Sequence, residues 1–383
     1  MKKIVIAPDS FKGTLSSGEV AKIISDAVRE CSAETEIVSV PIADGGEGTV
    51  DAFLTAVGGE RVEKQVTGPK NTPIPSFYGR LPDGTAVVEM AAAAGLPLMG
   101  GQLNVGMATT YGVGELMRDA LEHGARRIIL GLGGSATNDG GCGAAAALGV
   151  RFLDAQGAEF VPTGATLSRI ASIDSSNVKP LLRDASIIAM CDIDNPLCGE
   201  RGAAAVFGPQ KGADAGMVRT LDEGLLHLAE IVHRDLGKDV AERAGAGAAG
   251  GFGAGAVAFF GAELRRGIDV VLETVRFADL LKSASLVLTG EGCFDEQSLM
   301  GKAVAGVASR AKRAGVPVVC IAGAVRGEAQ GAREAGISAA FSIQKEPMPF
   351  AQAAPLSKGN LAFVTKQVLS LFLAAKSADG FNP

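Results

Sequence analysis

An acidic segment, MCDIDNPLCG (residues 190–199), carries residue types suited to metal or acid–base chemistry. Asp192 and Asp194 stand one residue apart and Asn195 follows them, directly after an apolar run that predicts a buried strand. Carboxylate and amide oxygens suit Mg²⁺, and a carboxylate beside a metal can also act as a base. The segment therefore predicts a loop at a strand end that binds a metal or supplies a base.

A glycine-rich segment, GLGGSATNDGG (residues 131–141), follows another predicted strand and precedes an alanine-rich helix. Small side chains and available N–H groups are typical of loops that cradle phosphate. The residues that we expect to line such a cradle are Gly133, Gly134, Ser135, Asn138 and Asp139.

The same segment has a second interpretation as a dinucleotide-binding loop. It matches Gly-x-Gly-x-x-Ala at Gly131, Gly133 and Ala136, and Asp154 follows after about 20 residues, as that fingerprint requires. A polar Thr-Asn-Asp insert stands where the helix of a dinucleotide-binding loop should begin, which argues against this interpretation. An NAD-dependent enzyme is the main alternative.

Two segments near the N-terminus also combine charged residues with glycine. APDSFKGT (residues 7–14) brings Asp9, Ser10 and Lys12 to the end of the first predicted strand, where Lys12 and a helix N-terminus could hold an anion. IADGGEGT (residues 42–49) places Asp44 at the end of the second, where it could bind a substrate hydroxyl or a hydrated metal. Each segment could instead be an ordinary capped turn.

Two later segments supply further charged groups. FGPQKGA (residues 207–213) carries Lys211, for which phosphate contact and surface exposure are equally plausible. LTGEGCFDEQSLMGK (residues 288–302) carries Glu291, Asp295 and Lys302 among glycines between a strand and a helix. A P-loop pattern, Gly-x-x-x-x-Gly-Lys-[Ser/Thr], occurs nowhere in the chain, so any phosphate here is held differently.

The elements that position these loops alternate between strand and helix. Both chain ends show the β-α-β-α pattern of a parallel sheet, and ligands of open α/β sheets bind at the carboxyl ends of the strands. We expect a doubly wound, Rossmann-like α/β domain from residues 1–75 and 285–383. Residues 76–284 should form an inserted α/β domain.

Composition and charge exclude several protein classes. The 383 residues are 47% hydrophobic with a net charge of −6, which disfavours a nucleic-acid-binding protein because such a protein needs a basic face. No apolar stretch is long enough for a membrane span, and the N-terminal apolar run is too short for a signal peptide. The six cysteines lack metal-ligand spacing. We expect a cytoplasmic protein, monomeric or homodimeric.

Together, these segments resemble the type 1 glycerate kinase family of bacteria. The segments occur in the order APDSFKGT, IADGGEGT, VVEMAAAAGL, TTYGVGEL, GLGGSATNDGG, DIDNPLCG, FGPQKGA, GAGAAGGFGAG and TGEGCFDEQSLMGK, from Lys3 to about Gly323. Two residues depart from the family pattern, which usually has Arg at the position of Cys293 and Thr at that of Ser298. The first departure removes a possible phosphate contact.

The resemblance implies transfer of the ATP γ-phosphoryl group to D-glycerate with Mg²⁺, in the cleft of a two-domain α/β fold. The product would be 2-phosphoglycerate, as in many bacterial members, or less commonly 3-phosphoglycerate. Since phosphoryl transfer needs alignment and charge neutralisation, Asp192 is expected to orient or deprotonate the acceptor hydroxyl, and Asp194 and Asp295 to bind Mg²⁺. The residues expected to hold glycerate or phosphate are Asp9, Ser10, Lys12, Asp44, Lys211, Glu291 and Lys302.

Two alternatives remain open at the level of sequence. One is the nicotinamide-dependent hydroxy-acid dehydrogenase suggested by the Gly131 pattern and Asp154. The other is a sensor that binds a sugar acid without consuming ATP, although the chain has no helix-turn-helix segment or basic face for DNA binding.

Overall fold

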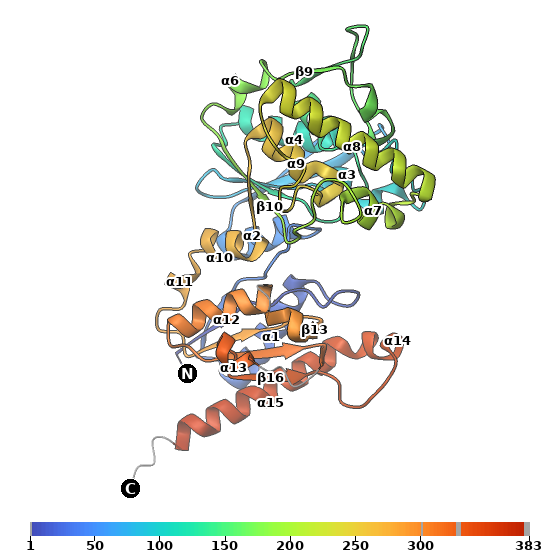
Figure 1. The fold of residues 1–383 in the computed structure, drawn as a ribbon. Helices are drawn as coiled ribbons and strands as arrows, with labels where there is room; N and C mark the ends of the chain where they lie inside the picture. The colour runs from blue at the N-terminus through green and yellow to red at the C-terminus, as the bar shows by residue number, and fades with distance from the viewer. Residues whose placement is uncertain (1, 300–301, 327–330, 379–383) are drawn as a thin grey trace. The chain divides into compact units, whose positions relative to one another are not determined.

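The computed structural model describes residues 2–299, 302–326 and 331–378 (Figure 1). The chain divides into two compact units, each built from more than one segment. The first unit consists of Met1–Ala43, Asp51–Val57 and Ile268–Pro383, and the second of Asp44–Val50 and Gly58–Gly267.

The first unit is built on a five-stranded parallel sheet in the order β16-β14-β12-β1-β2. Its strands are β1 (Lys3–Ile6), β2 (Glu36–Ser39), β12 (Leu286–Thr289), β14 (Val318–Ala322) and β16 (Ala339–Ser342). A short parallel pair joins β13 (Cys293–Phe294) to β15 (Ala324–Val325). Its helices are α1 (Ser17–Cys31), α11 (Phe277–Leu280), α12 (Ala303–Arg313), α13 (Ala332–Ala335), α14 (Phe350–Ala353) and α15 (Ser357–Ala378). Two helices, α2 (Thr49–Val57) and α10 (Gly267–Thr274), begin where the chain passes from the second unit to the first.

Local sequence explains why the first helix forms where it does. Ser16 caps α1 by accepting a hydrogen bond from the Glu19 N–H, and the Glu19 carboxylate accepts one from the Ser16 N–H in return. The buried stripe that includes Val20, Ile24 and Val28 packs against the sheet in the same core as residues of α15. Figure 1 shows α12 on the other face of the sheet, so helices cover both faces.

The strand order of the first unit places a change of winding direction between β1 and β12. From β1 the chain runs through α1 to β2 on one side, whereas from β12 it runs through α12 to β14 on the other. The Asp9 N–H donates a 2.8 Å hydrogen bond to the Gly290 carbonyl oxygen just past the two strand ends. In open α/β sheets, this switch point is where ligands bind.

The second unit is built on a six-stranded mixed sheet in the order β11-β10-β6-β5-β4-β3. Its strands are β3 (Glu60–Thr67), β4 (Pro73–Arg80), β5 (Ala86–Glu89), β6 (Arg127–Gly131), β10 (Ser186–Met190) and β11 (Glu263–Arg265). A small antiparallel sheet holds β7 (Arg151–Leu153), β8 (Glu159–Phe160) and β9 (Ser172–Asp174). The helices are α3 (Ala91–Ala94), α4 (Tyr111–Glu122), α5 (Cys142–Ala147), α6 (Val178–Leu182), α7 (Ala203–Phe207), α8 (Ala215–Leu236) and α9 (Ala248–Phe260).

Short 3₁₀ helices complete both units. They are η1 (Leu96–Met99), η2 (Gly164–Arg169) and η3 (Pro209–Lys211) in the second unit, and η4 (Glu296–Leu299) and η5 (Ala354–Leu356) in the first.

The glycine- and alanine-rich segment 244–255 packs backbone against backbone in the core of the second unit. A Cβ atom added at Gly255 would lie 2.1 Å from the Gly140 carbonyl oxygen, and one added at Gly253 would lie 2.1 Å from that of Gly245. Larger residues therefore cannot fit at these positions. The segment serves tight helix packing, which in turn braces the glycine-rich loop at its Gly140 end.

The unit bounds differ from the boundaries expected from the sequence, which divided residues 1–75 and 285–383 from 76–284. The strand β3 pairs with β4 from Glu60 to Arg80, so it belongs to the sheet of the second unit. Residues 268–284 group with the first unit. Pairing between strands, which sequence periodicity does not reveal, accounts for the first difference.

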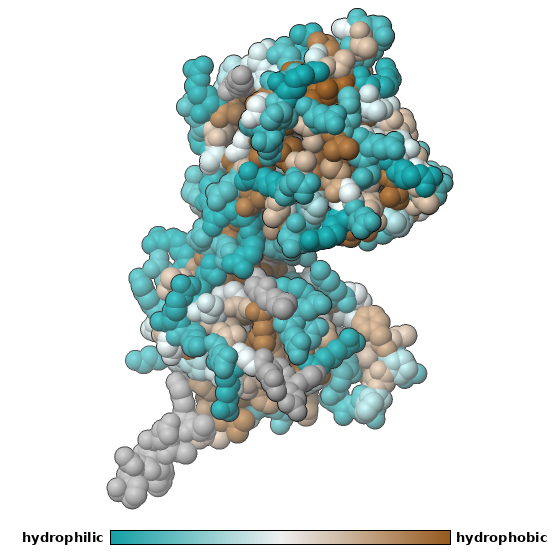
Figure 2. Space-filling model, viewed as in Figure 1, coloured by the Kyte–Doolittle hydropathy of each residue, from teal (hydrophilic) through white to brown (hydrophobic). Residues whose placement is uncertain are grey.

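The visible surface of each unit is mainly hydrophilic, with apolar residues gathered in small patches (Figure 2). Among the residues that the structure describes, no helix is both long enough and apolar enough to cross a membrane.

Candidate functional site

Three chemistry-bearing segments of the second unit converge at the carboxyl ends of β6 and β10. These strands are parallel neighbours, with Gly131 opposite Met190, so the glycine-rich loop and the acidic loop leave the same edge of the sheet. The Asp44 loop joins them, because the Gly133 N–H donates a 2.9 Å hydrogen bond to the Gly45 carbonyl oxygen. The structure thus brings together loops that are far apart in the sequence.

Glycine is required where the two glycine-rich loops touch. A Cβ atom added at Gly131 would lie 2.4 Å from the Gly45 carbonyl oxygen, and one added at Gly133 would lie 2.6 Å from the Gly46 Cα. Gly45 itself lies close to Met190 and has a φ of +86°, a region that favours glycine. The glycines therefore hold the backbones of the two loops together.

Asp44 and Glu89 hold the shape of the second-unit loop at residues 44–50. The Asp44 carboxylate accepts a 3.0 Å hydrogen bond from the Gly46 N–H. The buried Glu89, at the end of β5, accepts hydrogen bonds from the N–H groups of Gly48 (3.4 Å) and Val50 (2.9 Å). Sequence analysis missed Glu89, although a single carboxylate closing an apolar strand was a detectable signal.

Lys211 is buried, with only 3% of its surface exposed. Its ammonium group donates 2.7 Å hydrogen bonds to the Ser135 hydroxyl and to the Thr137 carbonyl oxygen, both in the glycine-rich loop. Burial lowers the pKa of Lys211 to about 7, an effect that the charge of Asp139 partly opposes. The sequence left exposure or phosphate contact open for Lys211; the structure places it beneath the loop.

Asp139 braces the glycine-rich loop from inside. Its carboxylate accepts hydrogen bonds from the N–H and hydroxyl groups of Thr110 (both 2.8 Å) and from the N–H groups of Gly141 (3.1 Å) and Gly143 (3.3 Å). Burial raises the pKa of Asp139, and these hydrogen bonds oppose the rise. Thr110 is another residue that sequence analysis missed, although it lies in the TTYGVGEL segment.

Asn138 is fully buried beside these residues, yet neither its side-chain nitrogen nor its oxygen has a hydrogen-bond partner within the described structure. Buried amide groups are normally paired, so an unpaired one calls for an explanation. A ligand that supplies the missing partners would provide one.

The two aspartates of the acidic loop are exposed at the end of β10. The Gly267 N–H, at the start of α10, donates a 2.8 Å hydrogen bond to Oδ1 of Asp192. The Asp194 side chain is 81% exposed and lies 3.5 Å from the Arg201 guanidinium. Asp192 is therefore anchored, whereas Asp194 extends toward solvent.

In the first unit, the segments that carry Asp9 and Glu291 meet at the switch point of the sheet. The Ser10 N–H donates a 2.6 Å hydrogen bond to the Asp9 carboxylate. A Cβ atom added at Gly292 would lie 3.3 Å from the Lys12 nitrogen of the main chain, so the two loops are in contact. The structure thus brings Asp9, Ser10, Lys12 and Glu291 to one end of β1 and β12.

Glu291 is a buried carboxyl group at this switch point, only 9% exposed, and its Oε1 has no hydrogen-bond partner within the described structure. Burial, and next the charge of Asp9, raise the pKa of Glu291 to about 7, against opposing effects of Ser298 and Lys302. Titratable groups with such environments are frequent at functional sites.

The later part of this segment is organised as a helix start. The Asp295 carboxylate accepts hydrogen bonds from the N–H groups of Gln297 (2.9 Å) and Ser298 (3.3 Å), and the Ser298 hydroxyl donates to the Asp295 carboxylate (3.4 Å). Lys302 is the N-cap residue of α12, and its ammonium group lies 3.3 Å from the Gln297 side-chain oxygen. Met300 and Gly301 of the segment lie outside the described residues.

The described residues contain no group of three or more histidine, cysteine, aspartate or glutamate side chains arranged to hold a metal ion. Asp194 lies in the second unit and Asp295 in the first. Mg²⁺ commonly binds through one or two protein carboxylates plus substrate phosphates and water, so the donors present are compatible with a nucleotide-borne Mg²⁺.

Comparisons with known proteins decide the family. The model of the glycerate kinase family matches residues 4–373. The chain belongs to this family. The glycerate kinase of Bacillus subtilis is 46% identical over 353 residues, which is 92% of each chain. The glycerate 2-kinase of Escherichia coli is 46% identical over 343 residues, covering 89% of this chain and 90% of that protein.

A solved structure agrees with this assignment of the glycerate kinase family. A chain described as glycerate kinase 2 from Salmonella typhimurium LT2 superposes with a TM-score of 0.87 at 43% identity, covering 98% of this chain and 99% of that chain. The family, the α/β fold with its doubly wound parallel sheet and the kinase class expected from the sequence are therefore confirmed.

The dinucleotide interpretation is not supported by the structure of the glycine-rich loop. The helix α5 begins at Cys142, six residues after Ala136, instead of opening within the Gly-x-Gly-x-x-Ala pattern. Asp154 lies in the turn between β7 and β8, where its carboxylate accepts hydrogen bonds from the N–H groups of Gln156 and Ala158. Asp154 thus stabilises a turn. Its spacing from the glycines could not distinguish this local role from the binding of a ribose.

Proposed function

We propose that this chain transfers the γ-phosphoryl group of ATP to D-glycerate in the presence of Mg²⁺, giving 2-phosphoglycerate and ADP. The observation that carries the proposal is the 46% identity, over nine-tenths of each chain, to a relative named glycerate 2-kinase. Formation of 3-phosphoglycerate is the less favoured outcome. We also propose that the enzyme works in the cytoplasm.

Asp192 is the group that we propose to orient the acceptor hydroxyl or accept its proton. The hydrogen bond from the Gly267 N–H to Oδ1 holds the Asp192 carboxylate in place at the end of β10. A base for phosphoryl transfer must lie within hydrogen-bond reach of the acceptor hydroxyl. The exposed position of Asp192 at a strand end satisfies that requirement for access.

The glycine-rich loop is the proposed phosphate cradle of the second unit. Gly134 and Ser135 would offer N–H groups, Gly133 would hold the loop against Gly45, and the unpaired amide of Asn138 would offer a further donor and acceptor. Lys211 would act on this loop by holding Ser135 and Thr137, and Asp139 by holding its backbone, so we propose that both residues position the cradle.

The switch point of the first unit is the second proposed binding region. Lys12 and Lys302 would hold anionic groups there, while Asp9, Ser10 and Glu291 would bind hydroxyl groups or hydrated metal. In the second unit, Asp44 would bind a glycerate hydroxyl. These assignments are supported by the positions of Asp9, Ser10, Lys12, Asp44 and Glu291 just after strands and by that of Lys302 at the start of α12.

Asp194 and Asp295 are the residues that we propose to hold Mg²⁺ with the phosphates of ATP. When bound, Mg²⁺ would neutralise charge on the transferring phosphoryl group. The protein side chains would bind the two substrates, orient the acceptor hydroxyl and accept its proton.

The experiment that tests this proposal is phosphorus NMR of the purified protein with Mg-ATP and D-glycerate. A new phosphomonoester signal would establish turnover, and its position would distinguish 2-phosphoglycerate from 3-phosphoglycerate. Asp192→Asn should lower kcat by at least ~100-fold if Asp192 is the base. The half-exposed Asp26 of α1, far from these loops in the sequence, gives a control, and Asp26→Asn should leave the rate unchanged. Unchanged ATP with folded protein would contradict the proposal.

A further inference from the structure

A loop of the second unit, residues 96–108, leaves the glycine-rich loop and returns to it. At its start, the Leu96 N–H donates a 2.9 Å hydrogen bond to the Gly134 carbonyl oxygen. At its end, Ala108 lies in one small apolar cluster with Ala136 of the glycine-rich loop, and Leu96 packs against that cluster. Residues 96–108 therefore form a rim beside the proposed phosphate cradle, and we refer to them as the rim loop.

The middle of the rim loop is anchored by Val105. The Val105 side chain is buried in an apolar cluster with Ala204 of α7 and Leu221 of α8. The Met107 N–H donates a 3.1 Å hydrogen bond to the Asn104 carbonyl oxygen, which closes a turn around the anchor. Contacts within the second unit therefore hold the rim loop in place without a ligand.

Two large apolar side chains of the rim loop remain exposed. Leu103 and Met107, two residues before and two residues after the anchor, are 41% and 50% exposed. Leu103 also lies beside the segment that carries Lys211, because a Cβ atom added at Gly212 would lie 2.6 Å from the Leu103 Cβ. Single exposed apolar residues are common on protein surfaces, but apolar surface next to a few placed polar groups is typical of ligand sites.

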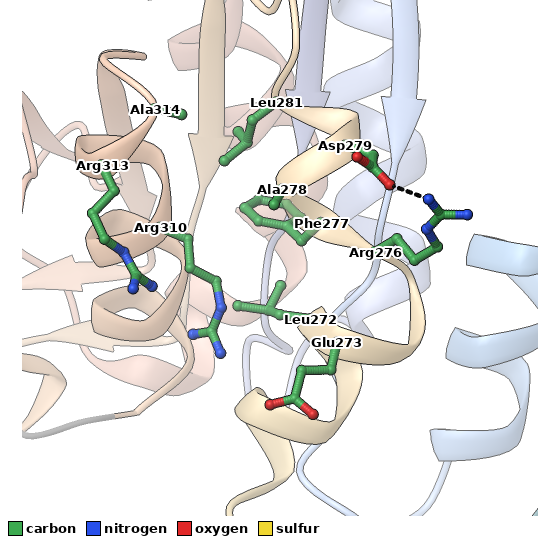
Figure 3. Close-up of a pocket in the computed structure, with 10 residues that line it drawn as sticks. All are labelled: Leu272, Glu273, Arg276, Phe277, Ala278, Asp279, Leu281, Arg310, Arg313 and Ala314. Carbon is green, nitrogen blue, oxygen red and sulfur yellow. Dashed lines mark ion pairs between the residues drawn. The ribbon is translucent and has the colours of Figure 1, made fainter.

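The hollow beside α12 in the first unit offers no comparable surface (Figure 3). Leu272, Phe277 and Leu281 line this hollow, but each of them is at most 3% exposed. Arg310 on its wall is already paired with Asp269 at 3.0 Å. We therefore assign no ligand to this hollow.

We propose that Leu103 and Met107 form the apolar surface that binds the purine base of ATP, whose phosphates the glycine-rich loop would hold. The faces of a purine ring are flat and aromatic, and the thioether of Met107 makes favourable contacts with aromatic rings. Since the ribose separates the base from the phosphates, the base binds beside the cradle, where the rim loop lies. The inference rests on the proposed function, because it takes the ligand of the glycine-rich loop to be ATP.

Isothermal titration calorimetry with ADP, in the absence of glycerate, tests the contact with the base. Leu103→Ala and Met107→Ala should each raise the dissociation constant at least about fivefold, because each removes apolar surface that the base would cover. Alanine keeps the Leu103 Cβ atom that lies against Gly212. Met107→Leu, which conserves the apolar volume, should bind ADP within about twofold of the wild type.

Leu226→Ala provides the matched control. Leu226 is 48% exposed on α8 and lies outside the rim loop, so its replacement should leave the affinity for ADP unchanged. Inorganic tripolyphosphate carries phosphates without a base and should bind equally to the wild type, Leu103→Ala and Met107→Ala. Unchanged binding of ADP by both rim-loop variants would overturn the inference. An equal loss of ADP and tripolyphosphate binding would also overturn it, since the variants would then have distorted the cradle.

Steady-state kinetics separates the base contact from the proposed function. Met107→Ala should raise the KM for ATP at least about fivefold, while kcat and the KM for D-glycerate stay within about twofold of the wild-type values. A rise confined to the KM for D-glycerate would overturn the inference, because the rim loop would then bind the other substrate. Binding of ADP that both variants weaken, in a protein that does not phosphorylate D-glycerate, would contradict the proposed function and leave the base site in place.

Discussion

The ammonium group of Lys211 donates a 2.7 Å hydrogen bond to the hydroxyl of Ser135, which lies 76 positions earlier in the chain. This contact fastens the 3₁₀ turn at Pro209–Lys211 to the glycine-rich loop, and a second 2.7 Å hydrogen bond to the Thr137 carbonyl oxygen completes the attachment. A lysine buried in this way costs free energy unless its hydrogen bonds are satisfied. The site therefore contains a buried amino group whose effect on the free energy of unfolding can be measured by replacing Lys211.

Lys211→Met should change how the free energy of unfolding depends on pH. Burial lowers the pKa of Lys211 to about 7 in the folded protein, whereas an unfolded lysine titrates near ~10.4. Between these values the unfolded chain binds more protons, so wild-type stability relative to Lys211→Met rises with pH, by on the order of 1 kcal/mol per pH unit. Urea unfolding of both proteins between pH ~7 and ~9 checks the slope.

The surface lysine Lys22 provides the control for this prediction. It is exposed and pairs with Asp26 across one helical turn, so Lys22→Met should follow the wild-type pH dependence. A difference in unfolding free energy between wild-type and Lys211→Met that stays constant over this pH range would show that Lys211 titrates normally in the folded protein.

Asn138→Ala should separate stability from activity. The buried amide of Asn138 has no partner within the described structure, so its removal relieves an unsatisfied polar group while leaving a small cavity. An unpaired buried group costs about 1 to 3 kcal/mol, which offsets the packing loss, and the unfolding free energy should change by less than about 1 kcal/mol. Turnover with D-glycerate should fall at least about tenfold if the amide binds substrate.

Two measurements decide this prediction: equilibrium unfolding without ligand, and steady-state kinetics. A large loss of stability in Asn138→Ala would mean that the amide is satisfied within the protein. Full activity together with unchanged stability would remove Asn138 from the proposed cradle.

Sequence reasoning located the loops but not their partners. The residues that follow β1, β6, β10 and β12 could be identified because apolar runs ending in Asp, Gly or Glu mark strand ends. The order of the segments was enough to identify the family. The switch point of the first unit, in contrast, depends on β1 pairing with β12 across 282 positions, a contact that no local pattern encodes.

The sequence also could not predict the roles of several site residues, because burial and long-range hydrogen bonds determine these roles. Lys211 on its loop gave no sign that it is buried beneath Ser135. Thr110 and Glu89 lie in segments that were noticed. The partners of Thr110, however, are the Asp139 carboxylate and the Ala144 N–H of α5, and those of Glu89 are the N–H groups of Gly48 and Val50. Hydrogen bonds of this kind depend on how loops from different elements meet.

Gly133→Ala should destabilise the second unit. The added Cβ would lie 2.6 Å from the Cα and 2.7 Å from the nitrogen of Gly46, and backbone atoms cannot move aside as a flexible side chain can. Overpacking of this kind typically costs about 1 to 3 kcal/mol. Gly18→Ala is the matched control, because Gly18 lies in α1 with nothing within 4 Å of the added Cβ, and it should be neutral or slightly stabilising.

Urea unfolding of the two alanine variants compares them directly. Equal stabilities would mean that the Asp44 loop can move away from Gly133 without cost. In that case Gly133→Ala should retain activity as well, and the contact between these two loops would have no part in forming the site.

Glu291→Gln should remove the acidic limb of the pH–rate profile. Burial and the charge of Asp9 raise the pKa of Glu291 to about 7, with Ser298 and Lys302 opposing, so the ionised form is lost as pH falls through 7. If the carboxylate binds a substrate hydroxyl or hydrated metal, kcat/KM of the wild type should fall about tenfold per pH unit below that value.

The Glu291→Gln variant should instead show a low and nearly flat pH–rate profile, whereas Glu296→Gln, at an exposed neighbour in η4, should keep the acidic limb of the wild type.

The free energy of unfolding gives an independent check of the pKa of Glu291. Because the folded pKa of Glu291 exceeds its unfolded value of ~4.3, the folded protein binds more protons between these values. The unfolding free energy of the wild type, relative to Glu291→Gln, should therefore fall as pH rises from ~4.3 to about 7. An acidic limb that persists in Glu291→Gln would assign it to another group, and a stability difference independent of pH would show that Glu291 titrates as an ordinary carboxyl group.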